Sequence, residues 1–540
     1  NLMSTKLPQL ARELFGQGRC DARKMARFTQ AAAQLVDGHG RATDELQRII
    51  FLVEKLYSAA FSAAARELFT SLVAQVGGKL SGPLPLPKNR VPYWLKDPHP
   101  LANFQSTPRL PRRAEVVVIG AGLTGAAAAY YLSLPPRKLD VVVLDAGDPA
   151  TQASGRNGGN FELIPENFFG DYGSYDGLAN ERYKFLKNSY PTVPDSVLSA
   201  QAQRSAAVII RFALQNAARM LQVIADEEID CDLSQSGWLR IAMNRREEAA
   251  LKDEVKLARS LGANIRLLTA ETIRARYGMP TRWSGRIVYG NGNYHPFKLV
   301  CGELRCALSR GVKLYTRTLV STIKSLRADH HEVVTARGTI RAKKVIVATN
   351  AFTAQLYPEL SAIRYFRSQI ANFEHVIDPL RGITMTAKDG DIYANFPAAG
   401  RYTDAQGTRR GMLHVGGGKD VPARDPWRPV PSRAVWQLLQ AEVAHYFPAT
   451  RGQPASRLWA GPMAFVEGKH GMRLPVLGPL GQGARQGVFI AVWCNGYGGS
   501  GCHNAGAGAA EWAVTGEVPS SMPQDVFGPA RLLSDAPQFI

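Results

Sequence analysis

Three glycines near residue 120 have the spacing of a phosphate-binding turn. Gly120, Gly122 and Gly125 follow the run EVVVIG and open the helix-forming stretch GAAAAYYL. The first glycine permits a sharp turn, the second lets a pyrophosphate reach the main chain, and the third allows close packing of helix on strand. The helix N-terminus offers unpaired N–H groups to the phosphates. The motif predicts dinucleotide binding at Gly120, Ala121, Gly122, Leu123, Thr124 and Gly125.

An acidic residue and a glycine-rich loop follow this motif. Asp145 ends the strand-like run DVVVLD, where a carboxylate can accept hydrogen bonds from an adenosine ribose. The next segment, DAGDPATQASGRNGGN, suits neither a helix nor a packed strand because of its glycines. Its main chain can lie against a flat ring, and Ser154, Arg156 and Asn157 can bond phosphate, ribityl hydroxyls or a ring edge. The loop therefore favours a flavin over a nicotinamide.

Strands of the nucleotide-binding type are scattered along the chain. Besides 115–119 and 140–145, the runs KKVIVATNA (343–351) and GVFIAVW (487–493) indicate buried strands. Between them lie helix-patterned stretches (205–227, 246–261, 432–446) and alternating strand-like ones (236–242, 286–290, 411–415). The spacing predicts a second domain inserted between the strands of the first.

We therefore predict a mixed α/β fold with a Rossmann-type domain, an inserted substrate domain with an antiparallel sheet, and an N-terminal all-helical extension. The extension spans 1–80, where LQRIIFLVEKLYSAAF has helical spacing, and a proline-rich linker spans 81–113, pinned by Tyr93 and Trp94. The Rossmann-type domain is assigned to 114–165, 205–235, 300–356 and 458–530, and the substrate domain to 166–204, 236–299 and 357–457.

Composition narrows the class of protein. With 540 residues, 45% of them apolar, the chain can form two or three domains. Its net charge of +20 is spread out, without a run of five or six like charges. We expect a solvated surface, with a funnel for anions as the alternative, and no nucleic-acid partner.

Cysteines and apolar runs bear on the compartment. The six cysteines lack CxxC spacing, and we expect them to be reduced thiols. We expect no cleavable secretory signal, because the first residues lack its basic, apolar and small-residue pattern. Charges interrupt the most apolar window, which begins at Ile49. We expect a cytoplasmic protein without a metal site. Its N-terminal helices are expected to pack on the catalytic body, or on a second copy to form a homo-oligomer. Contact of these helices with a membrane is the less favoured alternative.

Together these motifs resemble the D-amino-acid oxidase and glycine oxidase superfamily of FAD enzymes, and within it the gamma-glutamylputrescine oxidase branch. The resemblance covers roughly 112–520. KKVIVATNAFTAQLYP (343–358) resembles the family's returning strand and RGMLHVGGGKD (410–420) a strand of its substrate domain. WAGPMAF (459–465), LPVLGPL (474–480) and NGYGGSG (495–501) resemble the segment that closes over the flavin. The resemblance implies FAD as the cofactor and an amine or amino acid as the substrate.

The resemblance also extends the set of cofactor-binding residues beyond the glycine motif and Asp145. It adds Ala146, Ser154, Gly155, Arg156, Asn157, Gly158, Gly159, Val320, Ala348, Thr349, Asn350, Trp459, Gly461, Asn495, Gly496, Tyr497, Gly498 and Gly499. The turn at 495–501 is expected to open a helix over 502–516, whose positive end would stabilise negative charge at the flavin N1–C2=O region.

The sequence departs from the family in two respects, the residues that attach FAD covalently and the residues that bind the substrate carboxylate. ASGRNGGN holds no histidine, and no cysteine stands at Ala460 or Gly461, so the FAD is implied to be non-covalent. The family's carboxylate-binding arginine is replaced by Met463 here, and the place where other members carry a lysine instead is close to Ser500, so neither cation is present. The substrate either lacks an α-carboxylate or binds its acid elsewhere, with these candidates for a displaced clamp: Arg364, Arg367, Arg401, Arg409 and Arg473.

The resemblance implies hydride transfer from the carbon beside a neutral amine to flavin N5, hydrolysis of the imine, and reduction of oxygen to hydrogen peroxide. His295, Tyr393 and His470 are candidates for deprotonating the incoming ammonium. Two alternatives stay open: a dehydrogenase that passes electrons to a quinone or a protein, and a flavin-binding assembly protein with little redox activity.

Overall fold

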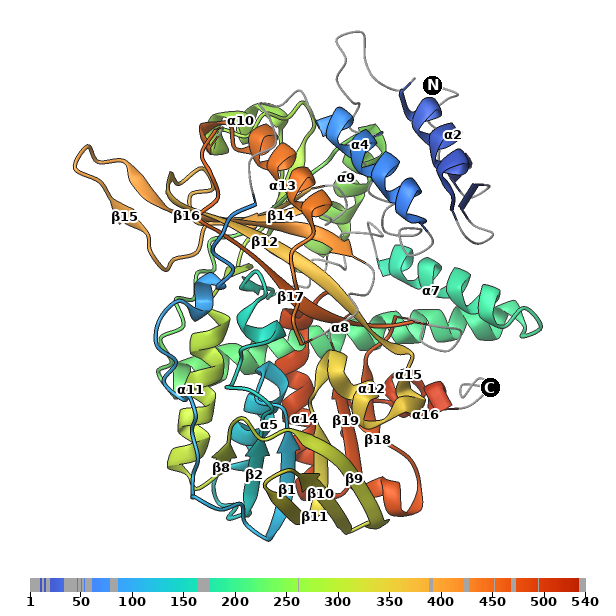
Figure 1. The fold of residues 1–540 in the computed structure, drawn as a ribbon, viewed down its shortest axis with the longest axis vertical. Helices are drawn as coiled ribbons and strands as arrows, with labels where there is room; N and C mark the ends of the chain where they lie inside the picture. The colour runs from blue at the N-terminus through green and yellow to red at the C-terminus, as the bar shows by residue number, and fades with distance from the viewer. Residues whose placement is uncertain are drawn as a thin grey trace.

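Two β-sheets, one above the other, form the body of the protein, with helices around them (Figure 1). The structure is a computed structural model of the 540-residue chain. It describes residues 10–11, 14–15, 20–33, 46, 50, 53, 61–77, 86–163, 175–260, 262–387, 392–420, 427–450, 452–467, 473–493 and 495–533.

The first sheet has eight strands and a parallel centre. Its order is β18-β19-β11-β1-β2-β8, with β9 and β10 joined through β11. The bounds are β1 (Arg113–Ile119), β2 (Val141–Leu144), β8 (Lys313–Tyr315), β9 (Val320–Arg327), β10 (His330–Thr335), β11 (Gly338–Val347), β18 (Val476–Pro479) and β19 (Val488–Val492). Neighbours from β19 through β8 pair in parallel, as the β-branched runs of the sequence predict.

Alternate residues of these strands pack on opposite faces. Val116 and Val118 of β1 join the core beneath the helices, whereas Val117 and Ile119 join the core beneath β9 and β10. The helices of the first core are α5 (Leu123–Leu132), α8 (Asp195–Asp226), α11 (Pro296–Ser309) and α14 (Cys502–Thr515). The helix predicted after the second glycine turn is thus present as α14. This layering is that of a Rossmann-type domain.

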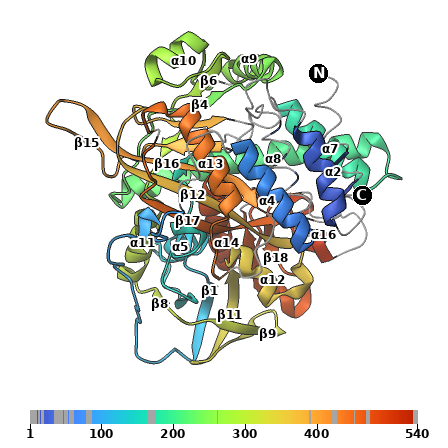
Figure 2. The same cartoon turned by 45° about the horizontal axis from the view of Figure 1, so that its top comes forward.

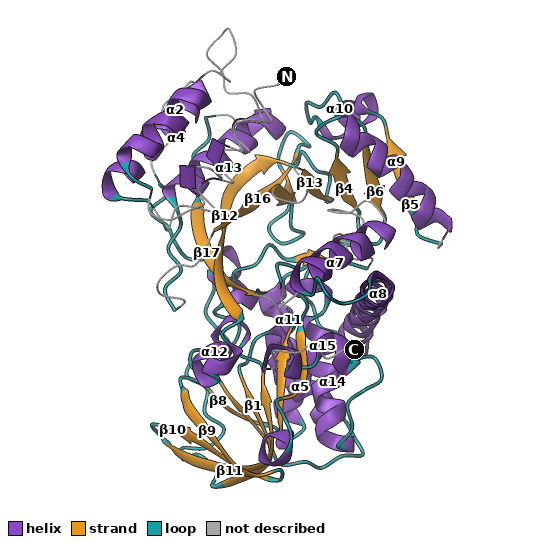
Figure 3. Ribbon diagram, turned by 90° about the vertical axis from the view of Figure 1, so that its right-hand side faces the viewer, coloured by secondary structure: helices purple, strands orange, loops and turns teal. Residues whose placement is uncertain are grey.

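The second sheet has nine strands and curves above the first (Figure 3). Its order is β17-β12-β16-β14-β13-β4-β6-β5, with β15 on β16. The bounds are β4 (Trp238–Ile241), β5 (Ile265–Leu268), β6 (Gly285–Val288), β12 (Ile363–Ile377), β13 (Thr384–Ala387), β14 (Ile392–Asn395), β15 (Tyr402–Thr403), β16 (Arg409–Asp420) and β17 (Arg457–Val466). Its pairs are antiparallel except β4 with β13, which are parallel.

The chain passes repeatedly between the two sheets. Strands β1 and β2 belong to the first, β4–β6 to the second, β8–β11 to the first, β12–β17 to the second, and β18 and β19 to the first. The predicted insertion of one domain into the other is therefore confirmed. The predicted domain boundary after residue 204 falls inside α8, which starts earlier because Pro194 is its N-cap.

Smaller elements complete the body. A two-stranded sheet joins β3 (Asn160–Phe161) to β7 (Gly292–Asn293). The remaining helices are α7 (Tyr175–Ser189), α9 (Arg245–Ser260), α10 (Ala270–Tyr277), α12 (Thr353–Leu356), α13 (Arg433–Tyr446), α15 (Gln524–Phe527) and α16 (Ala530–Leu533). The helix-patterned stretches 246–261 and 432–446 correspond to α9 and α13.

Helix α8 is the only helix in the described ranges that is long and apolar enough to cross a membrane. Of its apolar window, 44% is buried inside the protein, and a core helix of a folded domain passes the same test. Phe212 and Met220 of α8 lie in the core shared with α5 and α14. These apolar residues therefore serve packing within the first domain.

The N-terminal region contains two described helices, α2 (Ala22–Ala33) and α4 (Ala63–Gly77), and α4 lies between α2 and α13 (Figure 2). They have a core of their own, in which Phe15, Phe28 and Phe61 meet with ring centroids 5.3–5.8 Å apart. Most of the predicted helix at LQRIIFLVEKLYSAAF lies outside the described residues. The described part of this region therefore agrees with a helical extension.

Candidate active site

A cavity of about 430 Å³ lies between the two sheets. Its floor is the carboxyl end of the first sheet, represented by Ile119 of β1, Leu144 of β2 and Ala348 after β11. Its roof is one face of the second sheet, to which six strands contribute Trp238, Arg240, Ser368, Thr386, Tyr393, Gly417, Gly461 and Met463. The cavity therefore joins the nucleotide-binding motif to the substrate domain.

The glycine motif has the close contacts that its spacing predicts. Gly120 has φ +101°, and a Cβ there would lie 2.5 Å from the carbonyl oxygen of Ala348. A Cβ on Gly125 would lie 1.7 Å from the carbonyl oxygen of Gly120. Gly122 is the N-cap of α5 without a side-chain cap, so the first turn of the helix faces the cavity at Leu123 and Thr124. This cradle fits the pyrophosphate of a dinucleotide.

Asp145 supports the motif directly. Its Oδ2 accepts a hydrogen bond from the Ala121 N–H at 2.6 Å, and its Oδ1 accepts one from the Gly147 N–H at 2.8 Å. Burial raises its pKa to about 6. The carboxylate therefore holds the glycine turn to the end of β2, and its remaining lone pairs face a cavity that Val320 also lines.

The polar side chains of the loop 153–159 bond protein groups within the loop and next to it. Ser154 Oγ accepts from the Leu123 N–H at 2.9 Å, and Asn157 Oδ1 accepts from the Gly159 N–H at 2.8 Å. Arg156 donates from Nε to the Thr151 carbonyl at 2.8 Å and from Nη1 to the Ala460 carbonyl at 3.1 Å. These side chains therefore shape the loop, and its main chain meets the cavity.

Two tryptophans hold this loop from behind. The Trp94 Nε1–H donates to the Asn157 carbonyl at 2.8 Å, and the Trp459 Nε1–H donates to the Arg156 carbonyl at 2.9 Å. His414 lies between them, with ring centroids 4.9 Å from Trp94 and 5.5 Å from Trp459. Sequence reasoning missed that Trp94 supports this loop, because Trp94 and Asn157 are 63 residues apart in the chain and meet only in the folded protein.

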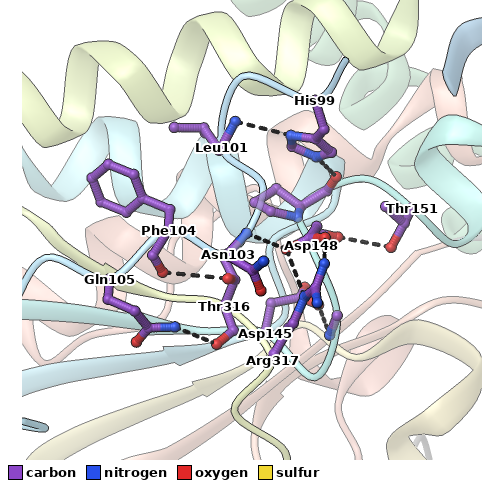
Figure 4. A network of polar contacts seen from close by, with 12 residues as sticks. His99, Leu101, Asn103, Phe104, Gln105, Asp145, Asp148, Thr151, Thr316 and Arg317 are labelled. Atoms are coloured by element: carbon purple, nitrogen blue, oxygen red, sulfur yellow. Dashed lines mark hydrogen bonds and ion pairs between the residues drawn. The ribbon is translucent and has the colours of Figure 1, made fainter. Parts of the chain in front are cut away.

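The segment 99–105, predicted to be a linker, is bonded to the base of the same loop (Figure 4). The Asn103 N–H donates to Asp148 Oδ1 at 2.8 Å, and Arg317 pairs with Asp148 Oδ2 at 2.8 Å. The His99 Nε2 lies 2.8 Å from the Pro149 carbonyl oxygen. This segment is therefore part of the framework of the site.

Helix α8 positions the C-terminal glycine turn. Asn216 is fully buried, donates from Nδ2 to the Gly499 carbonyl at 2.9 Å, and accepts at Oδ1 from the Asn504 N–H at 3.0 Å. Arg219 donates to Asn504 Oδ1 at 2.6 Å. The turn and the N-terminus of α14 are thus held in one arrangement. Sequence reasoning missed Asn216 because nothing in its own segment marks it.

We expect Asn216→Ala to weaken flavin binding about tenfold and to lower the free energy of unfolding by ~1–3 kcal/mol, because two buried polar groups lose their partner. Titration of the apoprotein with FAD and thermal unfolding measure these effects. Gln222→Ala, which removes an exposed hydrogen bond to Asp226 on the same helix, is the control and should change neither. Unchanged FAD affinity in Asn216→Ala would refute the positioning role.

Most predicted cofactor residues line the cavity. They are Gly120, Gly122, Leu123, Thr124, Asp145, Ala146, Ser154, Arg156, Asn157, Gly158, Val320, Ala348, Thr349, Asn350, Gly461, Gly496, Tyr497, Gly498 and Gly499. The others, Ala121, Gly125, Gly155, Gly159, Trp459 and Asn495, do not line it. They support the lining from outside: Gly159 lies under Trp94, for example, and Asn495 Oδ1 accepts from the Val466 N–H at 2.8 Å.

The three candidate proton acceptors have different positions. Tyr393 lines the cavity between Gly158 and Gly416, where an added Cβ would lie 2.6 and 2.2 Å from its ring. Burial raises its pKa, which keeps the hydroxyl neutral, and Ser368 is its hydrogen-bond partner. His295 does not line the cavity but is the N-cap of α11. His470 lies outside the described residues.

None of the five arginines proposed as a displaced clamp lines the cavity. They bond elsewhere: Arg364 lies 3.5 Å from Glu467, for example, and Arg367 donates to the Val430 carbonyl at 2.6 Å. Instead Arg240 of β4 lines it, with 4% of its surface exposed. The buried acid Glu162 also lines the cavity. Arg240 was missed because only the pairing of β4 with β13 brings it beneath the roof.

No group of three or more His, Cys, Asp or Glu side chains that could hold a metal ion occurs within the described ranges. The cradles and helix ends of the cavity instead suit an extended dinucleotide.

Known proteins resemble this chain in sequence and fold. It is 29% identical over 250 residues to Gamma-glutamylputrescine oxidoreductase of Escherichia coli (strain K12), an alignment that covers 46% of this chain and 51% of that protein. It is 24% identical over 389 residues to Probable oxidoreductase OrdL of Rhizobium meliloti (strain 1021), covering 71% and 81% respectively. Glycine oxidase from Geobacillus kaustophilus shares the fold, with a TM-score of 0.55 at 21% identity over 76% of this chain and 96% of that chain.

The chain thus spans about half the length of the Escherichia coli relative. The family described as FAD dependent oxidoreductase, DAO, matches residues 115–514, which include both sheets apart from the first two residues of β1, and all the residues that line the cavity. This match confirms the predicted family and its FAD cofactor. The chain belongs to the DAO family of FAD-dependent oxidoreductases.

Proposed function

We propose that the protein holds FAD non-covalently and oxidises the C–N bond of an amine or amino acid in the cavity between the sheets. The observation that carries the proposal is the continuity of that cavity, which runs from the glycine motif to Tyr393, Thr386 and Arg240 of the roof. Molecular oxygen is the proposed electron acceptor, giving hydrogen peroxide. The substrates are drawn from the amines and amino acids that the names of the similar proteins indicate.

Distinct parts of the lining would hold the parts of FAD. The first turn of α5 and the glycine motif would hold the pyrophosphate, and Asp145 and Val320 would hold the adenosine. Gly158, Gly461 and the turn at 496–499 would hold the flavin. The absence of a histidine from the loop 153–159 and of a cysteine at Ala460 and Gly461 supports non-covalent binding.

When bound, FAD supplies a two-electron acceptor at flavin N5 for the hydride that leaves the substrate carbon. The roof keeps water from the substrate and orients it, and the neutral Tyr393 hydroxyl can donate or accept a hydrogen bond there. The N-terminus of α14, without a side-chain cap, supplies a positive dipole end beside Cys502, which lines the cavity. The imine product then reacts with water.

The described cysteines, Cys20, Cys231, Cys301, Cys306 and Cys502, all carry free thiols, which supports the cytoplasm as the proposed location. A homo-oligomer through the N-terminal helices stays a prediction.

Anaerobic mixing with single amines tests the proposal. We expect the absorbance of the bound flavin near its visible maximum to bleach with a true substrate, and to return on admission of air together with hydrogen peroxide. Gamma-glutamylputrescine, glycine and simple alkylamines form a first panel. Bleaching without rapid reoxidation by air would indicate a dehydrogenase instead, and a flavin that no amine bleaches would refute the proposed chemistry.

A further inference from the structure

We propose that Phe352, Trp427 and Met463 form an apolar subsite of the cavity, the aryl subsite, which binds an aryl group of the substrate. The enzyme then oxidises arylalkylamines, and it discriminates against amino acids that carry the same aryl group together with an α-carboxylate. This inference rests on the proposed amine oxidation and names the substrate class of the same cavity.

The three residues of the aryl subsite line one end of the cavity. Met463 lies on β17, the edge strand of the roof. Phe352 ends η4 (Asn350–Phe352), a short helix after β11 that packs against β17 and β12. The ring of Trp427 lies against that of Phe352, with ring centroids 4.3 Å apart and ring planes inclined at 33°. A thioether and two adjacent rings therefore share this end.

Strand β12 fixes the segment that carries Trp427. Arg367 donates from Nη1 to the Val430 carbonyl at 2.6 Å, and the Ser432 N–H donates to Gln369 Oε1 at 2.7 Å. Strand β12 is also the neighbour of β17, which carries Met463. The Trp427 ring is thus held beside the strand pair that forms this end of the roof.

The lining at this end is uncharged. Strands β12, β16 and β17 and the two short helices after β11 contribute only uncharged residues to the described lining. Opposite Met463 in the register of β12 lies Phe366, whose ring centroid is 4.8 Å from that of Phe465. A carboxylate beside Met463 would lose its water without gaining a partner, whereas an apolar group has no such cost.

Arg156 is the charged residue next to this end, since a Cβ added to Gly461 would lie 2.9 Å from the Cβ of Arg156. Its Nε donates to the Thr151 carbonyl and its Nη1 to the Ala460 carbonyl. The guanidinium is therefore engaged by main-chain groups of the loop and of β17. We expect an uncharged group of the substrate beside Met463.

The exposure of Trp427 marks an opening of the cavity. Leu319 and Trp427 are the exposed large apolar residues of the described lining, with 55% and 38% of their surface accessible. Leu319 precedes Val320, which would hold the adenosine, so the opening at Leu319 belongs to the cofactor. The opening at Trp427 lies at the roof. An aryl group there covers the accessible indole by ring–ring contact, and the Met463 sulfur suits the edge of the same group.

The hydroxyl of Tyr393 lies close enough to the aryl subsite to share one small substrate with it. Its hydrogen-bond partner Ser368 stands opposite Gly461 in the pairing of β12 with β17. Met463 follows Gly461 by two residues on the same face of β17, a rise of about 7 Å. An amine beside the Tyr393 hydroxyl is therefore joined to a ring beside Met463 by a linker of about two carbons.

Two matched pairs of compounds test the proposal on the FAD-loaded enzyme. 2-Phenylethylamine and ethylamine differ in the ring, and 2-phenylethylamine and phenylalanine differ in the α-carboxylate. We expect wild type to prefer 2-phenylethylamine at least 20-fold in kcat/KM over ethylamine and over either enantiomer of phenylalanine. Anaerobic bleaching of the flavin and peroxide release measure these ratios.

Three variants assign the preferences to residues. Trp427→Ala should lower kcat/KM for 2-phenylethylamine at least 10-fold more than for ethylamine, mainly through KM, because the ring loses its buried contact. Met463→Arg should narrow the preference over phenylalanine at least 10-fold, because a guanidinium supplies the missing partner of the carboxylate. Met463→Leu keeps an apolar side chain of similar volume and should retain most of that preference.

A second measurement does not need turnover. Titration with 2-phenylethanol, in which a hydroxyl replaces the amine, is followed by the shift of the flavin spectrum. Its dissociation constant should be at least 10-fold weaker in Trp427→Ala than in wild type. Tyr402→Ala, which removes an exposed aromatic ring outside the cavity, is the control and should match wild type in both measurements.

The outcomes separate the two proposals. If no amine bleaches the flavin, the proposed oxidation fails, and the 2-phenylethanol titration still decides whether the aryl subsite exists. If ethylamine or phenylalanine is oxidised as efficiently as 2-phenylethylamine, or if Trp427→Ala leaves the ratios and the titration unchanged, the aryl subsite is overturned. A Trp427→Ala protein that binds FAD more weakly and loses activity equally with both amines would mean that the rings cover the flavin, and also overturns the proposal.

Discussion

Replacing Gly125 with alanine is expected to abolish flavin binding. The added Cβ would lie 1.7 Å from the carbonyl oxygen of Gly120 and 2.8 Å from its carbonyl carbon, both of them backbone atoms. Helix α5 must therefore move away from the turn that would hold the pyrophosphate. Because Gly125 does not line the cavity, the loss comes from this displacement alone. We expect FAD affinity to fall at least 100-fold, or about 2.7 kcal/mol.

Titration of the refolded apoprotein with FAD measures this effect, and circular dichroism shows whether the variant retains its fold. Gly481→Ala is the matched control, since its Cβ would meet no atom closer than 3.5 Å, and it should bind FAD as wild type does. A folded Gly125→Ala protein with wild-type affinity would mean that the cradle of the glycine motif does not hold the cofactor.

Replacing His414 with phenylalanine is expected to make the protein markedly less sensitive to acid. His414 is fully buried against the rings of Tyr93, Trp94 and Trp459, and burial lowers its pKa to about 3. The unfolded chain binds a proton near pH 6.5, whereas the folded protein does not. Stability is therefore lost as pH falls from about 6.5 towards 3, by about 1.4 kcal/mol per pH unit for this group.

Two other buried groups contribute to the same pH range. His295, whose pKa burial lowers to about 4, adds a loss of the same sign below pH 6.5. Asp145 has the opposite sign: its pKa is raised from 3.8 to about 6, so the folded state holds the extra proton and stability falls as pH rises through that window. The difference between wild type and His414→Phe cancels the contribution of Asp145 and measures His414, to which His295 is electrostatically coupled.

Urea unfolding at several pH values between 4 and 7 measures this difference. The slope of the free energy of unfolding against pH reports how many more protons the unfolded state binds than the folded state, and this number should be smaller by about one in His414→Phe than in wild type. His445→Gln changes an exposed imidazole outside this cluster and should keep the wild-type slope. Parallel slopes for His414→Phe and wild type would contradict the buried, neutral state of His414.

The local geometry of the glycine motif was predictable from the sequence because its constraint lies within one segment. Gly120, Gly122 and Gly125 act together at a fixed spacing in one turn. The strand before them and the helix after them are recognised from the same short segment. The roles of Arg156 and Asn157 were less predictable. Each was expected to bond a ligand, and in the structure each bonds main-chain groups of its own segment, because the partners within reach depend on how the loop folds.

The amino-acid sequence by itself determined the family, the FAD-binding motif and the alternation of two sheets along the chain, because short-range spacing and strand patterns carry these properties. The tertiary structure alone decided which side chains share the cavity. Arg240 rather than Arg364 lies beneath the roof, and Trp94 rather than a loop residue holds the Asn157 carbonyl. The physical reason is that strand pairing and side-chain packing join residues far apart in the chain, and no local pattern records which partners will meet.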